Sequence, residues 1–224
     1  MPGLFITATG TEVGKTWLTR ALARNLVRRH HTVAALKPIE TGVVTEALDA
    51  VAIAHASGQP EDAELPSLYR SAPALAPWSL TLRGDHDPLI MDPLVAMIST
   101  RGRESEWLLV EAAGGILVPL TERATNADLA AVLGLPLVMV AKDELGTLSH
   151  TLTAMESAQR RGLEVAAVVL MQSAPDAGAG SNHDVLSRML APTPVLAFRQ
   201  TEDDDDALAD EAERCGLMAL LLGD

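Results

Sequence analysis

The stretch Ala8–Thr16, which reads Ala-Thr-Gly-Thr-Glu-Val-Gly-Lys-Thr, constrains the fold more than any other part of the chain. It follows the apolar run Leu4–Ile6 and continues into a segment with apolar residues at helical spacing. A strand, a tight glycine turn and a helix start in this order direct several backbone N–H groups toward one point, where an anion binds. The stretch therefore predicts a loop that holds the phosphates of a nucleotide.

Two side chains at the end of this loop suit a nucleotide. The Lys15 ammonium would neutralise the terminal phosphates, and the Thr16 hydroxyl, in the first turn of the following helix, would coordinate Mg²⁺. The spacing departs from the common pattern, which has a glycine five positions before Gly14 where this chain has Thr9. We expect ATP contacts from Thr11, Glu12, Val13, Gly14, Lys15, Thr16 and Trp17.

Length, charge and cysteine content limit the classes of protein. The 224 residues are most naturally one domain, residues 1–224, with a core large enough to need no disulfide or metal. The formal charge of -13 disfavours a nucleic-acid partner, because phosphate backbones repel an acidic surface. The lone Cys215 cannot form an internal disulfide and fits the cytoplasm. No apolar run reaches the length of a membrane span, so we expect no membrane partner.

Apolar runs of strand length alternate with segments of helical periodicity along the chain. The expected strands are 4–6, 32–36, 107–111, 137–141, 165–171 and 195–198; the expected helices follow the loop and cover 47–54, 92–101, 126–133, 147–161 and 184–190. This alternation predicts an α/β fold with a mostly parallel sheet covered by helices on both faces, of the P-loop NTPase kind. Residues 57–68 are expected to form a loop. The proline-broken stretch 69–78 fits neither regular element and either lines a pocket for an aliphatic ligand or packs as a surface loop. The acidic run 202–206 is expected to be the solvated start of the final helix.

Two predicted strands end in charged residues, at the edge of the sheet where open parallel sheets bind ligands. Lys37 follows the strand 32–36 and precedes a proline and a polar turn. Glu111 ends the strand 107–111, and a carboxylate at the tip of a buried strand needs a partner. In a nucleotide-binding sheet that partner is Mg²⁺, held together with the loop threonine. Gly114 and Gly115 follow and allow close approach of the backbone to a phosphate or substrate.

Together these features resemble the dethiobiotin synthetase family. The resemblance rests on Gly14-Lys15-Thr16, Lys37-Pro38 with Thr41-Gly42, Glu111 with residues 114–120, residues 128–130 with 133–136, and residues 145–151. It covers most of residues 4–171, and the loop of that family carries the same extra residue relative to the common spacing. The family usually has glycine at the positions of Ala8 and Ala112 and asparagine at the position of Ser149.

The resemblance implies an ATP- and Mg²⁺-dependent ligase of biotin biosynthesis. Such an enzyme closes the cyclic urea of dethiobiotin from 7,8-diaminononanoate, CO₂ and ATP. A substrate amine takes up CO₂ as a carbamate, the γ-phosphoryl group is transferred to the carbamate, and the second amine attacks the mixed anhydride. Transfers of this kind depend on positioning and charge stabilisation, without a covalent nucleophile.

The resemblance also implies a role for individual residues. Lys15 would neutralise the β- and γ-phosphates, and Lys37 would hold the carbamate and the γ-phosphoryl oxygens. Thr11 and Thr41 would orient the phosphoryl group and the carbamate. The metal ligands would be Thr16, Asp49 and Glu111. Substrate contacts would come from Lys37, Thr41, Gly114 and Gly115, and from Leu145, Gly146, Thr147 and Leu148 of a partner subunit. The family asparagine that contacts adenine would fall near Gln172.

The partner-subunit contacts imply a homodimer, and three alternatives stay open. The first is a partition or septum-positioning ATPase, which carries a lysine early in a related loop where this chain has Thr9-Gly10-Thr11. The second is an amidotransferase-type ligase related to cobyrinate synthetase, for whose glutaminase domain the chain has no room. The third is an inactive homologue.

Overall fold

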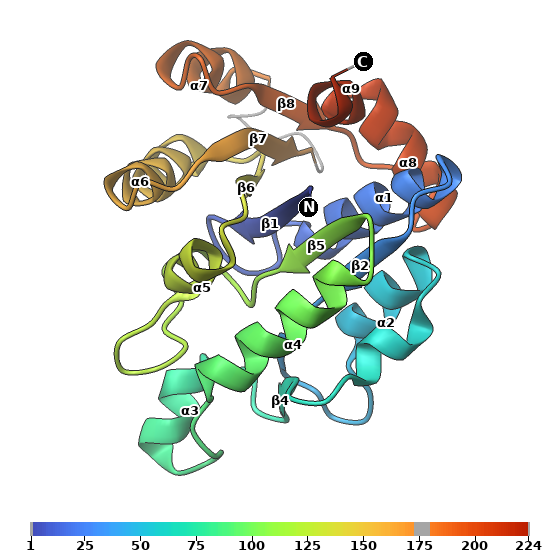
Figure 1. The fold of residues 1–224 in the computed structure, drawn as a ribbon. Helices are drawn as coiled ribbons and strands as arrows, with labels where there is room; N and C mark the ends of the chain where they lie inside the picture. The colour runs from blue at the N-terminus through green and yellow to red at the C-terminus, as the bar shows by residue number, and fades with distance from the viewer. Residues whose placement is uncertain (1, 173–179, 224) are drawn as a thin grey trace.

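The computed structural model describes residues 2–172 and 180–223, and its centre is a six-stranded parallel sheet (Figure 1). The strand order is β2-β5-β1-β6-β7-β8. The strands are β1 (Gly3–Ala8), β2 (Val33–Leu36), β5 (Trp107–Glu111), β6 (Leu137–Lys142), β7 (Val165–Met171) and β8 (Val195–Phe198). The predicted parallel α/β sheet is thus confirmed. Strand β1 pairs with β5 on one side and β6 on the other, so the phosphate loop leaves the middle of the sheet.

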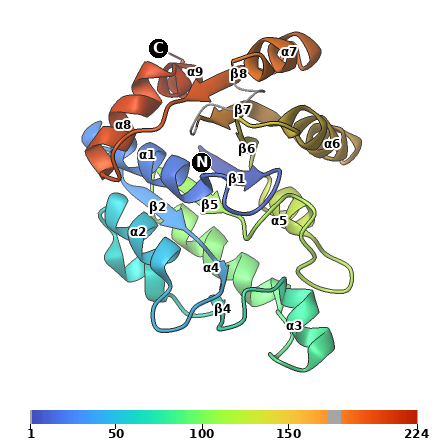
Figure 2. The same ribbon diagram turned by 180° about the vertical axis from the view of Figure 1, so that it is seen from behind.

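Helices cover both faces of this sheet, as Figure 1 and the reverse view in Figure 2 show. One face is covered by α1 (Lys15–Arg28), α2 (Leu48–Ala56), α8 (Asp205–Arg214) and α9 (Leu217–Leu222). The other is covered by α4 (Met91–Arg103), α5 (Asn126–Leu133), α6 (Thr147–Arg160) and α7 (Asn182–Met189). The strands are buried on both sides, which explains their unbroken apolar runs. Within the described part of the chain, no helix is long and apolar enough to cross a membrane.

The prediction that residues 69–78 form no regular element was wrong. This stretch contains β4 (Tyr69–Ser71) and the start of α3 (Pro77–Arg83). The sequence also did not predict β3 (Ile39–Thr41) or the 3₁₀ helix η1 (Pro60–Glu64), which lies within the predicted loop 57–68. Strands β3 and β4 pair in parallel as a separate small sheet. A three-residue strand is too short to show a period, and Pro77 stands at the start of α3, where proline is tolerated. Prolines in this stretch therefore mark a helix start as well as a turn.

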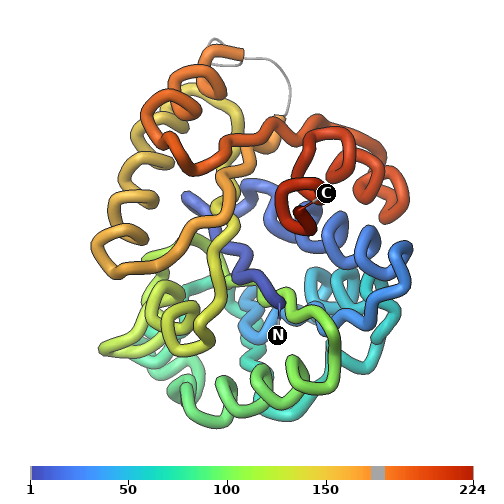
Figure 3. The backbone as a smooth tube through the Cα atoms, turned by 45° about the horizontal axis from the view of Figure 1, so that its top comes forward, coloured from blue at the N-terminus to red at the C-terminus, as the bar shows by residue number. Residues whose placement is uncertain are grey.

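The acidic run 202–206 starts a helix as predicted, but that helix is α8 and not the final one, and its carboxylates are not merely solvated. Arginines on one stripe of α1, four residues apart, pair with acids along α8. The pairs are Arg20–Asp205 at 2.7 Å, Arg24–Asp206 at 2.6 Å and Arg28–Asp210 at 2.7 Å. Figure 3 shows the blue segment of α1 beside the red segment of α8. The arginines of α1 thus hold α8 against the helix that begins at the phosphate loop.

Candidate active site

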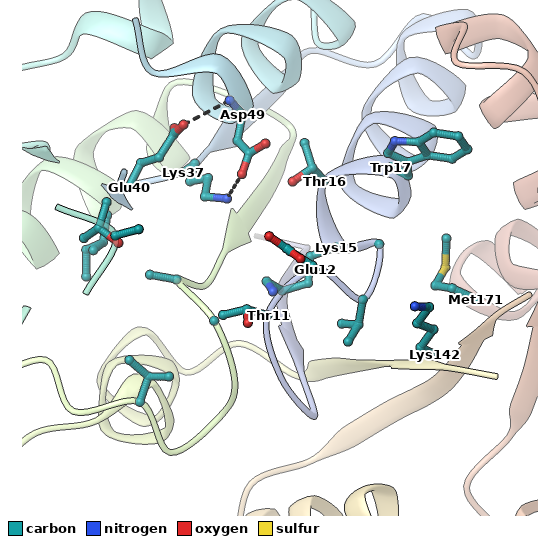
Figure 4. Close-up of a pocket in the computed structure, with 18 of the residues that line it drawn as sticks. Thr11, Glu12, Lys15, Thr16, Trp17, Lys37, Glu40, Asp49, Lys142 and Met171 are labelled. Atoms are coloured by element: carbon teal, nitrogen blue, oxygen red, sulfur yellow. Dashed lines mark hydrogen bonds and ion pairs between the residues drawn. The ribbon is translucent and has the colours of Figure 1, made fainter. Parts of the chain in front are cut away.

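A cleft of about 810 Å³ opens where the phosphate loop meets the carboxyl ends of the strands (Figure 4). The residues predicted to contact ATP all line it, namely Thr11, Glu12, Val13, Gly14, Lys15, Thr16, Trp17 and Gln172. Lys37, Thr41, Asp49 and Gly114 line the same cleft. The fold therefore gathers residues from the loop, from the carboxyl ends of several strands and from the first turn of α2 into one space.

At the end of the phosphate loop, directly before α1, the backbone has a left-handed conformation that favours glycine. Gly14 has a φ of +98°, and a Cβ there would lie 2.9 Å from Cγ of Met171. The next residue, Lys15, is buried, and its ammonium donates to the Gly10 carbonyl at 3.2 Å. Burial lowers the pKa of Lys15, with the nearby Glu111 carboxylate opposing this effect only in part. A buried ammonium that lacks full compensation attracts an anion.

Behind the loop, Glu111 accepts hydrogen bonds from three side chains. Its carboxylate is 1% exposed; Oε1 accepts from the Thr16 hydroxyl at 2.9 Å and from the Lys37 ammonium at 2.8 Å. Oε2 accepts from the Thr19 hydroxyl at 2.8 Å. Lys37 also donates to Asp49. Burial alone would lower the pKa of Lys37, but the carboxylates of Glu111 and Asp49 outweigh it and raise the pKa above its usual range. Lys37 is therefore charged at neutral pH.

The three predicted metal ligands lie around one point. The Lys37 ammonium joins the carboxylates of Asp49 and Glu111, and Thr16 contacts the same oxygen of Glu111 as Lys37 does. Among residues 2–172 and 180–223, no group of three or more His, Cys, Asp or Glu could hold a metal by itself. Two carboxylates and a hydroxyl nevertheless fit Mg²⁺, which keeps several waters and takes its other oxygens from nucleotide phosphates.

The cleft has two chemically different ends. In Figure 4, Lys37, Glu40 and Asp49 lie on one side of the loop, and Trp17, Lys142 and Met171 lie on the other. On the Met171 side, the ends of β7 and β8 lie together, because the backbone N–H of Gln172 donates to the Phe198 carbonyl at 2.8 Å. The residues that follow these two strands, Gln172 and Arg199–Gln200, line the cleft there. Ala74–Pro77 add an apolar wall. Of the two alternatives for 69–78, the pocket lining is thus confirmed for residues 74–77.

The small residues after β5 pack directly against the phosphate loop. Gly114 has a φ of +73°, and a Cβ there would lie 2.9 Å from Cγ2 of Val118. A Cβ on Gly115 would lie 3.2 Å from the Ala8 carbonyl oxygen, so Gly115 supports the loop from behind and does not line the cleft. Ala8 and Ala112 are not among the described non-glycine residues with positive φ, so their methyl groups cost no backbone strain.

The predicted substrate residues 145–148 do not reach this cleft within one chain. Gly146, with a φ of +97°, is the N-cap of α6, Thr147 is buried, and Leu145 is 76% exposed. Their predicted role depends on a second subunit and stays a prediction.

Sequence reasoning missed several residues of the site. Thr19 lies three residues after Thr16 on the same helix face, and that spacing could have identified it. Lys142, Arg199 and Gln200 follow from the rule that ligands bind at the carboxyl ends of parallel strands. Glu40 has no such signal, since its partners can be recognised only in three dimensions.

Comparisons with known proteins identify relatives of this chain. The family described as an AAA domain matches residues 2–201. The ATP-dependent dethiobiotin synthetase BioD of Anaeromyxobacter dehalogenans strain 2CP-C is 40% identical over 177 residues, which are 79% of this chain and 79% of the relative. The same enzyme of Caulobacter sp. strain K31 is 36% identical over 220 residues, 94% of each chain.

Solved structures show the fold of the chain. The MinC:MinD cell division protein complex of Aquifex aeolicus matches with a TM-score of 0.59 at 11% identity, covering 100% of this chain and 97% of that one. The septum site-determining protein MinD with Mg-ADP, from Pyrococcus horikoshii, matches with a TM-score of 0.55 at 14% identity, covering 98% and 93%. Identities this low establish a common P-loop architecture alone. The identity to the curated relatives extends over most of both chains, and on that ground the chain belongs to the ATP-dependent dethiobiotin synthetase family.

Proposed function

We propose that this chain, as a single synthetase domain, closes the cyclic urea of dethiobiotin from 7,8-diaminononanoate, CO₂ and ATP. The observation that carries the proposal is the cluster of Lys15, Lys37 and Asp49 in one cleft beside the phosphate loop, with the buried Glu111 hydrogen-bonded to Lys37 behind it. Every reacting species of this reaction is anionic where it reacts, and two buried ammonium groups suit such species.

The two lysines would bind different anionic groups, Lys15 the phosphates of ATP and Lys37 the carbamate. Lys15 stands at the start of α1 and would bind the terminal phosphates together with the N–H groups of the loop. Lys37 stands at the end of β2 and would bind the carbamate and the γ-phosphoryl oxygens. Thr11 and Thr41, which line the cleft, would orient the phosphoryl group and the carbamate. No covalent nucleophile is needed, because the carbamate oxygen attacks phosphorus directly.

Mg²⁺ would be held by Thr16, Asp49 and Glu111 and, when bound, would neutralise charge on the transferring phosphoryl group. The Lys37 ammonium already contacts both of these carboxylates. Lys37 is therefore their counter-ion, and this ammonium and a metal ion would compete for the same oxygens.

The remaining contacts follow the shape of the cleft. Gln172, at the end away from Lys37, would face the nucleotide base, and the apolar wall at residues 74–77 suits the aliphatic chain of the diamine. We also propose a homodimer in which residues 145–148 of the partner subunit contact the substrate carboxylate at the start of a helix. A cytoplasmic location fits the lone cysteine.

The alternatives have less support. A partition-type ATPase would need the early loop lysine, and the loop has Thr9-Gly10-Thr11 at those positions. An inactive homologue would be expected to have lost charged residues from the site or to carry strained substitutions in it. The lysines and carboxylates are present, and Ala8 and Ala112 have no positive φ.

Phosphate release with ATP and Mg²⁺ tests the function, measured with and without 7,8-diaminononanoate and bicarbonate. The synthetase predicts release only when both co-substrates are present, with dethiobiotin formed in equal amount. Phosphate release at the same rate with and without the co-substrates would favour an ATPase switch protein. No phosphate release despite intact nucleotide binding would favour an inactive homologue. Sedimentation of the purified chain then tests the dimer, which predicts twice the 23.6 kDa mass of one chain.

A further inference from the structure

Glu40 lies in β3, three residues after Lys37, and its carboxylate is 8% exposed. Its two oxygens accept from backbone N–H groups at the start of α2: Oε1 from Asp49 at 3.1 Å and Oε2 from Ala50 at 2.9 Å. Figure 4 shows Glu40 pointing across to Asp49. The residue before α2, Ala47, provides no side-chain cap. Glu40 therefore supplies the cap from another strand, with a charge that suits a helix N-terminus.

Unlike an ordinary helix cap, Glu40 holds the backbone of a residue that takes part in the site. Asp49, whose N–H it holds, is the residue whose carboxylate pairs with Lys37. Glu40 thus links the backbone of Asp49 to the strand that begins two residues after Lys37, the other ion-pair partner. The chain between them does little to hold the start of α2, since Val44 is 84% exposed and Leu48 is 69% exposed.

Arg70 supports the same arrangement from β4. It stands opposite Glu40 in the register of the small sheet, and its guanidinium donates to the Lys37 carbonyl at 3.1 Å and the Tyr69 carbonyl at 3.1 Å. Burial lowers the pKa of Arg70, and the negative charge of Glu40 opposes that effect. The small sheet β3–β4 thus holds the main chain of Lys37 through Arg70 and the main chain of Asp49 through Glu40.

We propose that Glu40 is a positioning residue for the ring-closing reaction, which sets the place of Asp49 relative to Lys37 and Glu111. The proposal rests on the proposed function for its catalytic consequence. The carboxylate of Asp49 is 44% exposed, so without its backbone anchor water can separate it from the site. A shift of Asp49 would loosen both the pair with Lys37 and the oxygen set for Mg²⁺.

The test compares Glu40→Ala and Glu40→Gln with Asp204→Ala. Asp204 is a matched control, because its carboxylate also accepts two N–H bonds at a helix start, those of Asp206 and Ala207 at the start of α8. We expect Glu40→Ala to lower kcat and to raise the Mg²⁺ concentration at half-maximal rate, each by roughly tenfold or more, as for other residues that orient metal ligands. The KM for ATP should change much less. Glu40→Gln, which keeps one acceptor oxygen, should recover part of the loss.

Thermal unfolding separates positioning from mere stabilisation. Both alanine variants should unfold at lower temperature, but Asp204→Ala should keep the wild-type kcat and Mg²⁺ dependence. If Glu40→Ala loses thermal stability alone, Glu40 is only a helix cap and the proposal is overturned.

Titration calorimetry with Mg²⁺ and a non-hydrolysable ATP analogue gives a readout that does not need the reaction. Weaker Mg²⁺-dependent binding in Glu40→Ala supports the positioning role even if the wild-type protein forms no dethiobiotin, which would refute the proposed function alone. Unchanged Mg²⁺-dependent binding together with unchanged kcat would refute the positioning role while leaving the function intact.

Discussion

Replacing Lys37 by methionine removes the ammonium that joins Asp49 and Glu111 while keeping an unbranched side chain. Glu111, at 1% exposure, would lose the only described cation that contacts it, although two hydroxyl groups would still donate to it. Removing one partner of a buried pair costs about 3 to 5 kcal/mol, and the remaining hydroxyl donors favour the lower end. We therefore expect Lys37→Met to lower the free energy of unfolding by about 3 kcal/mol when EDTA removes divalent metal. Nucleotide binding should stay nearly intact, and ring closure should be lost.

Mg²⁺ should then stabilise the variant more than the wild type, because the two carboxylates no longer have an ammonium between them. A free Mg²⁺ concentration about ten times the Kd would return about 1.4 kcal/mol. Urea unfolding with EDTA and with Mg²⁺ measures both effects. Arg101→Met is the matched control, since it breaks the Arg101–Asp62 pair, 2.5 Å long with a fully buried Asp62, away from the cleft. The control should lose stability without any gain from Mg²⁺. Equal Mg²⁺ stabilisation of wild type and Lys37→Met would refute competition for these oxygens.

Three further predictions follow from single contacts. Thr19→Val removes a buried hydroxyl 2.8 Å from Glu111 and should cost about 2 kcal/mol in urea unfolding, whereas Thr19→Ser should cost much less; equal costs would contradict the hydrogen bond. Gly14→Ala places a side chain at a residue with a φ of +98° and should abolish binding of a fluorescent ATP analogue; normal binding would show that the loop tolerates this backbone strain. The hydrogen bond from Arg29 holds the pKa of Glu213 below its ordinary value of 4.5, so its stabilising contribution is present above pH 4.5 and is lost as pH falls through the folded-state pKa. Glu213→Gln should flatten that acid limb of stability, and an unchanged limb would exclude this pair as its source.

Most of the fold could be predicted because its strands are buried on both faces. A strand of this kind leaves an unbroken apolar run in the sequence, and the predicted runs 107–111, 165–171 and 195–198 match β5, β7 and β8. The small sheet β3–β4 could not be found in this way. Its strands have three residues each, include polar residues, and are stabilised by pairing with each other.

The candidate site could be predicted in part for a related reason. Lys37 and Glu111 end neighbouring strands, and the carboxyl ends of parallel strands meet at one edge, so the sequence order alone brings them close. The pairing of α1 with α8 has no such rule. Arg20 and Asp205 are 185 positions apart, and nothing in either segment indicates the other.

Glu111 hydrogen-bonds to residues on both sides of the site, the phosphate-loop helix and Lys37. One oxygen accepts from Thr16, at the start of the phosphate-loop helix, and from Lys37, which follows β2 and for which we propose binding of the carbamate. The other accepts from Thr19, one turn further along the same helix. In a buried environment each of these donors changes how strongly the carboxylate holds the others. A carboxylate at 1% exposure has no water to replace a lost donor, so a shift of Lys37 toward substrate must be accompanied by another positive charge at Glu111. We expect that Thr16, Asp49 and Glu111 would hold Mg²⁺ with the nucleotide and that the metal would supply such a charge, so nucleotide binding would precede the action of Lys37 on the carbamate.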